Sequence, residues 1–81
     1  MINGVQDLAA EALFVSYLQP SQQPTHETVE RTVTAMILLH GCEGCAAGVA
    51  EEFGDHPENA VERMHWVHAE LTEPAAPQVA R

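Results

Sequence analysis

The sequence predicts an all-α fold, a small bundle of three to four short helices with a helix-turn-helix-like pair in its C-terminal half. Apolar residues recur at three- and four-residue spacing in four segments, and proline or glycine stands between the segments. No run has the alternation of a β-strand. With 81 residues, the chain is expected to form one helical domain over residues 1–73, followed by a disordered tail at 74–81.

The first helix is expected at residues 5–19, because its apolar residues form one stripe. Pro20 and Pro24 bracket the polar stretch that follows, where missing amide donors and restricted backbone angles prevent the helix from continuing. This stretch is expected to be a linker. The residues of the stripe are Val5, Leu8, Ala9, Ala12, Leu13 and Tyr17.

The second helix is expected at residues 26–40. Thr25 can accept a hydrogen bond from a free amide of the first turn, and Glu27 favours the positive end of the helix dipole. Gly41 is expected to end the helix. Its buried face is expected to comprise Val29, Val33, Met36, Ile37 and His40.

The third and fourth helices are expected at residues 43–53 and 56–72, joined by a tight turn. Gly54 is a candidate left-handed cap, and Asp55 a candidate N-cap, with Pro57 in the first turn and Glu58 completing a capping box. The buried stripes are predicted to be Cys45, Ala46, Val49, Ala50 and Phe53, and then Ala60, Val61, Met64, Val67 and Leu71.

Charge limits the classes of partner. Twelve acidic residues stand against three arginines, without any lysine, and the formal net charge is −9. Such a surface repels nucleic acid and anionic lipid, which leaves proteins, metal ions or cationic ligands. No signal segment or apolar run of about 20 residues is evident, so a cytoplasmic protein without membrane contact is expected. Because the core is small, a homodimer or a bound partner would help to bury an apolar face.

The pair of helices over residues 49–66 suggests a DNA-binding regulator. The second helix of such a unit needs basic or amide side chains on its outer face. The outward positions predicted here offer one permanent positive charge beside two carboxylates, so DNA is a disfavoured partner, and a joint that only serves the core is the simpler explanation. These positions are Asn59, Glu62, Arg63, Trp66 and Glu70.

A second alternative is a Cys2His2 zinc site formed by Cys42, Cys45, His65 and His68. Two thiolates and two imidazoles satisfy tetrahedral zinc, and residues three apart on a helix share a side. The site requires an antiparallel hairpin of the last two helices, since a steep crossing would separate the pairs. The simpler alternative is a buried Cys45 with partly exposed histidines.

The spacing of Cys42 and Cys45 also invites comparison with thioredoxin-like enzymes. The βαβ setting of those enzymes is absent, and Glu43 is adjacent with no lysine nearby in sequence, so redox activity is disfavoured. The chain has two serines and no glycine-rich phosphate loop or nucleophile elbow. We therefore expect a non-enzymatic protein that needs no cofactor other than the zinc considered above.

The remaining candidate is a protein-interaction surface around Trp66. This side chain falls on the polar side of its predicted helix, where Glu62, Arg63 and Glu70 would form a charged rim around an aromatic anchor. The alternative is that the first helix covers Trp66. The preferred function is a small acidic interaction module, regulatory in role, whose charge steers a basic protein partner.

The block GCAAGVAEEFGDHPENA followed by RMHW, together with LQPSQQPT, resembles a group of short helical proteins of actinomycetes such as Streptomyces. The resemblance covers roughly two-thirds of the chain, from Leu13 to Trp66, and implies no assigned activity. Members of that group are richer in arginine and usually carry only the equivalent of Cys45. Cys42, His65 and His68 would then be departures, which weakens both the zinc and the DNA-binding alternatives.

Overall fold

The computed structural model describes residues 4–72, and within this range the fold is all-α, as the sequence predicts. The elements are α1 (Gly4–Phe14), a short 3-10 turn η1 (Pro20–Gln22), α2 (His26–Asp55) and α3 (Pro57–Thr72), without any strand. The predicted disordered tail at 74–81 lies outside the described residues.

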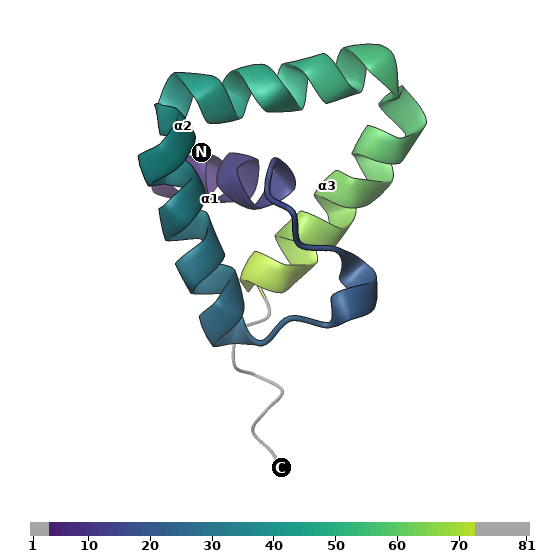
Figure 1. Ribbon diagram of the computed structural model, residues 1–81. Helices are drawn as coiled ribbons and strands as arrows, with labels where there is room; N and C mark the ends of the chain where they lie inside the picture. Colours follow the sequence, from purple (N-terminus) through teal and green to yellow (C-terminus); the bar gives the residue numbers. More distant parts are fainter. Residues whose placement is uncertain (1–3, 73–81) are drawn as a thin grey trace.

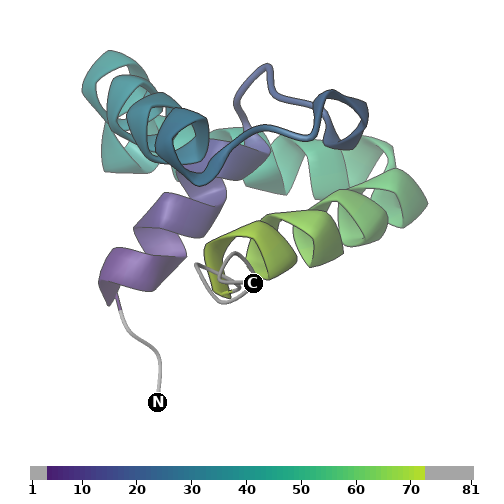
Figure 2. The same ribbon diagram turned by 90° about the horizontal axis from the view of Figure 1, so that it is seen from below.

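Helix α2 is bent into two arms, which we call the first arm (residues 26–40) and the second arm (residues 42–55). Figure 1 shows these arms and α3 as three sides of a triangle, with α1 across its middle. Viewed from below, α1 lies against the first arm and close to α3 (Figure 2). Helix α1 therefore contacts both longer helices and holds the bundle together.

Helix α1 ends at Phe14, so the prediction that it continues to residue 19 is wrong. The chain turns because the Ser16 hydroxyl donates to the Leu13 carbonyl at 2.7 Å and accepts from the Leu18 amide at 3.2 Å. Such local side-chain hydrogen bonds compete with helix propagation. Tyr17, expected on the buried stripe, is consequently 68% exposed.

Helix α2 begins as predicted, because the Thr25 hydroxyl accepts a hydrogen bond from the Thr28 amide at 3.1 Å. Gly41 ends the helical conformation of the first arm, as predicted, and helix resumes at Cys42 in a new direction. Its φ of 77° and ψ of 172° lie outside the helical region, yet helix continues on both sides. The predicted helices at 26–40 and 43–53 thus correspond to the two arms of α2. The arms approach closely at the bend, where a Cβ at Gly44 would lie only 2.9 Å from the His40 Cβ.

The joint between α2 and α3 is shorter than predicted. Gly54 does not adopt the left-handed cap conformation, and the second arm continues through Asp55. His56 is the single residue between the helices, with φ −140° and ψ 68°, and Pro57 is the first residue of α3. The predicted caps at Gly54 and Asp55 are therefore wrong, whereas proline in the first turn of the last helix is confirmed.

The described core consists of two adjoining groups of buried side chains. The larger group joins α1, both arms of α2 and α3, and Phe14 stacks on Phe53 with ring centroids 5.9 Å apart. The smaller group joins α1 to the bend of α2 and comprises Ala12, Met36 and Cys45. The larger group has as its buried members Ala10, Leu13, Phe14, Leu18, Val29, Ala60 and Val67.

Helix α2 is also the one described helix that is long and apolar enough to cross a membrane. This criterion counts only length and composition, and Gly41 divides α2 into two arms that are each shorter than a membrane span, so the expected localisation stays a prediction. Core helices of soluble proteins meet the same criterion, but only 17% of the apolar window of α2 is buried. Much of this apolar helix thus faces outward in the isolated chain.

Candidate functional site

The four predicted zinc ligands are not brought together. Cys45 is fully buried beside Ala12 and Met36, whereas Cys42, His65 and His68 are exposed. Among residues 4–72, no group of three or more histidine, cysteine or acidic side chains could hold a metal ion. The second arm and α3 diverge from their joint at His56, and the cysteines lie at the far end of that arm (Figure 1).

Burial also makes Cys45 a poor ligand in this arrangement. Its thiol donates to the Met36 carbonyl at 3.8 Å. Burial raises the pKa of the Cys45 thiol, and the nearby Glu11 carboxylate and Cys42 act in the same direction. The raised pKa favours the protonated thiol, whereas zinc binds the thiolate.

Arg63 does not point outward, as its position in the sequence pattern suggested, but toward α1. Its Nε donates to the Phe14 carbonyl at 2.7 Å, and its Nη2 donates to the carbonyls of Ser16 at 3.0 Å and Leu18 at 2.9 Å. A longer contact of 3.4 Å reaches the Leu13 carbonyl. The guanidinium thus satisfies carbonyl groups that are left free where α1 ends.

The same guanidinium lies over two aromatic rings. Its central carbon is 5.7 Å from the centroid of Phe14 and 5.3 Å from that of Trp66. Trp66 is half-buried and packs against the larger core group. Of the four residues predicted to form an interaction surface, Arg63 and Trp66 are therefore engaged inside the fold, Glu62 is exposed and Glu70 is partly buried.

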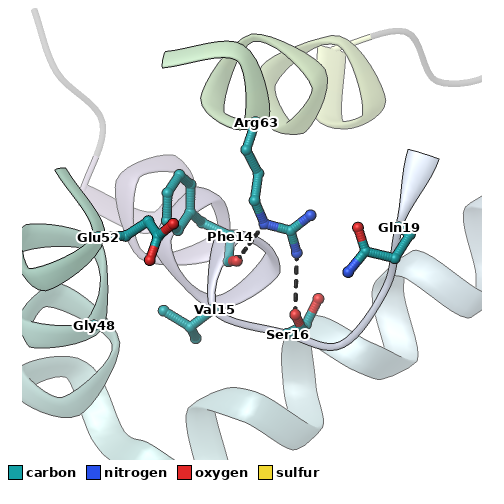
Figure 3. A pocket seen from close by; sticks show the side chains of 7 residues that line it. All are labelled: Phe14, Val15, Ser16, Gln19, Gly48, Glu52 and Arg63. Carbon is teal, nitrogen blue, oxygen red and sulfur yellow. Dashed lines mark hydrogen bonds between the residues drawn. The ribbon is translucent and has the colours of Figure 1, made fainter. Parts of the chain in front are cut away.

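A pocket of about 400 Å³ lies between the end of α1, the second arm and Arg63. Figure 3 shows the guanidinium above the turn at Ser16, with Glu52 of the second arm on one side and Gln19 on the other. Burial lowers the pKa of Arg63, and the Glu52 carboxylate acts against this change. Because Arg63 donates to the protein's own carbonyls, this pocket is best explained as a support for the turn after α1.

The most exposed apolar surface lies elsewhere, on the first arm of α2. Leu38 is 81% exposed and Leu39 is 68% exposed. A shallow groove of about 470 Å³ runs beside Leu38 and is also lined by Glu30, Arg31, Thr34 and Ala35. We call Ala35, Leu38 and Leu39 the α2 apolar face.

The sequence analysis did not identify this face, although the sequence contained a signal for it. Val29 and Met36 are buried as predicted, and the positions of Leu38 and Leu39 lie off that stripe. Two large exposed apolar residues outside the buried stripe are unusual for a surface helix. That signal indicates a second apolar face on the first arm.

Comparison with models of protein families, with curated proteins and with solved structures finds no match for this chain.

Proposed function

We propose that this chain is a small, non-enzymatic, cytoplasmic interaction module with a regulatory role, and that it binds a protein partner through the α2 apolar face. The observation that carries the proposal is the exposure of Leu38 and Leu39 on an otherwise acidic protein. Burying a leucine side chain contributes about 1.5–3 kcal/mol, so the two residues together can supply a substantial part of the binding free energy of a complex.

The shape of the surface favours a partner with an apolar groove. Ala35, Leu38 and Leu39 are three and four residues apart, which is the spacing with which a helix inserts into such a groove. Glu30 and Arg31 lie at one end and supply a polar rim. The contact area is supported by a helix whose other face is anchored in the core through Val29 and Met36.

Charge indicates the chemistry of the partner. With a net charge of −9, this chain attracts a protein with basic residues around its groove and repels a second copy of itself. We therefore propose a different, basic protein as the partner in preference to a homodimer. Association with such a partner should weaken as salt is added.

A helix-turn-helix regulator of DNA is the weaker alternative. The exposed positions of α3 include Glu58 and Glu62, and Arg63, the only arginine of this helix, is turned toward α1. A recognition helix with this charge distribution would repel the phosphate backbone. Zinc binding likewise has no support from the positions of the cysteines and histidines among the described residues.

The proposal is tested by replacing Leu38 with a photo-crosslinking amino acid in the full chain, in cells. A protein trapped from position 38 is identified, purified and titrated against the wild-type chain. We expect Leu38→Glu to weaken this binding by at least about tenfold, which corresponds to about 1.4 kcal/mol. Raising the salt concentration should weaken the wild-type complex.

Val61→Glu is the matched control, because Val61 is 44% exposed on α3 and the substitution introduces the same charge away from the α2 apolar face. It should leave the affinity unchanged. Equal losses of affinity in Leu38→Glu and Val61→Glu would contradict the α2 apolar face as the binding surface. If position 38 crosslinks only to a second copy of the chain, the proposed basic partner is wrong and the α2 apolar face forms a homodimer.

A further inference from the structure

The bend of α2 places the two cysteines in different environments. Gly41 interrupts the helix, so Cys42 is the first residue of the second arm and Cys45 follows within its first turn. Cys42 is exposed, whereas Cys45 is fully buried. A reagent in solution therefore meets only one of the two thiols.

The spacing of the two residues in a helix brings them near the distance that a disulfide spans. Helical geometry places Cα atoms three residues apart at about 5 Å, within the range that disulfides span. The Cβ atoms of such a pair are somewhat too far apart in an ideal helix. Cys42 adjoins the non-helical Gly41, so its backbone can move toward Cys45 without breaking the middle of a helix.

We propose that Cys42 and Cys45 form a redox-active dithiol, in which exposed Cys42 exchanges with disulfide substrates and Cys45 then closes an intrachain disulfide. The sequence alone disfavoured redox activity because the βαβ setting is absent. The structure adds two observations to the sequence motif: the second arm begins at Cys42, and Cys42 is exposed whereas Cys45 is buried. This inference does not depend on the α2 apolar face.

The reaction needs an external disulfide as the oxidant. The Cys42 sulfur, after losing its proton to solvent, attacks one sulfur of the substrate, which breaks the substrate's S–S bond and releases one thiolate. When Cys45 shifts out of its buried position, its thiol loses its proton to solvent, and its sulfur then attacks the Cys42 sulfur and releases the second thiolate. Two protein thiols are oxidised to one disulfide, and the substrate is reduced to two thiols.

Closing this bond changes the core. Cys45 must give up its contact with the Met36 carbonyl and shift within the smaller core group, where Ala12 of α1 is its neighbour. Oxidation is therefore coupled to the packing of α1 on the bend of α2. Before that shift, burial protects Cys45 from direct attack, so the order of the two steps is fixed.

The test uses the reduced full chain, a metal chelator and oxidised glutathione, with products measured by intact mass. The wild-type chain should end as an intrachain disulfide, lighter by two hydrogen atoms. Cys45→Ala should stop at the glutathione adduct on Cys42. Cys42→Ser should react roughly 100-fold more slowly, because Cys45 reacts only after local opening. Circular dichroism verifies that both variants are folded.

A second measurement needs no substitution. Brief alkylation of the reduced wild-type chain, followed by peptide mapping, should modify Cys42 and leave Cys45 free. The proposal is overturned if the wild-type chain remains a stable glutathione adduct or forms dimers linked through Cys42. It is also overturned if Cys42→Ser reacts at the wild-type rate or if both thiols are alkylated equally in the folded chain.

Discussion

Replacing Arg63 with methionine tests how the end of α1 is stabilised. The substitution keeps a long apolar side chain against Phe14 and Trp66 but removes the guanidinium. Three contacts of 2.7–3.0 Å to main-chain carbonyls are lost, together with the two cation–π contacts. The carbonyls of Phe14, Ser16 and Leu18 then lose the guanidinium that donates to them.

The structure sets the size of the effect. A hydrogen bond to a charged group contributes about 1.5–3 kcal/mol, but water can replace part of it at this half-buried position, which suggests about 1 kcal/mol per contact. Adding about 0.5 kcal/mol for the cation–π contacts gives a loss of about 3–4 kcal/mol. Total stability for a domain of this size is about 4–12 kcal/mol, so the loss is a large fraction of it.

Urea unfolding followed by circular dichroism measures this loss, and thermal unfolding should show a fall in Tm of about 20 °C. Arg31→Met is the matched control, because Arg31 is exposed and bound only to Glu27, at 3.3 Å along the same helix. It should cost less than about 0.5 kcal/mol. A difference between the two variants below about 1 kcal/mol would refute the capping role of Arg63.

The remaining predictions concern the bend, the contact between α1 and α2, and the buried thiol. Gly41→Ala should lower the free energy of unfolding by about 1–2 kcal/mol, because φ at this position is 77°. Gly54 also has open space around it but has a helical backbone, so Gly54→Ala should stabilise the protein by up to about 1 kcal/mol. Urea unfolding checks both values. Gly48→Ala should cost about 1–3 kcal/mol because its Cβ would lie 2.7 Å from Val15 Cγ1, and Val15→Ala in the same chain should recover much of this loss. Folding raises the pKa of Cys45, so the thiol ionises at a lower pH in the unfolded chain than in the folded chain. The contribution of Cys45 to the free energy of unfolding is therefore complete below about pH 8.5. It falls as the pH rises toward the folded pKa, by at most about 1.4 kcal/mol per pH unit. Urea unfolding of the wild-type chain and of Cys45→Ala between neutral and alkaline pH, under reducing conditions, checks this difference, and parallel pH profiles would contradict it.

Features set by neighbouring residues could be predicted from the sequence. The start of α2 depends on the hydroxyl of Thr25 and the amide of Thr28, which are three residues apart, and the buried positions of Val29 and Met36 follow from helical periodicity. The first turn of α3 follows from Pro57 for the same reason. Each of these features requires only local chemistry.

Features that depend on distant contacts were missed. The helical arms on both sides of Gly41 were predicted, but the angle between them depends on packing of the second arm, where Gly48 lies against Val15. The orientation of Arg63 depends on carbonyls about 45 residues away in the chain. The periodicity of α3 alone placed Arg63 on the outer face of the helix, because this periodicity does not show where α1 packs.

The central claim, that the α2 apolar face binds a basic protein, is tested most directly by chemical-shift mapping on the isotope-labelled chain. The partner identified by crosslinking at position 38 is titrated into it. The account predicts that the largest shifts cluster at residues 31–42, around Leu38 and Leu39. Shifts centred on α3 around Trp66, with the first arm of α2 unchanged, would contradict it.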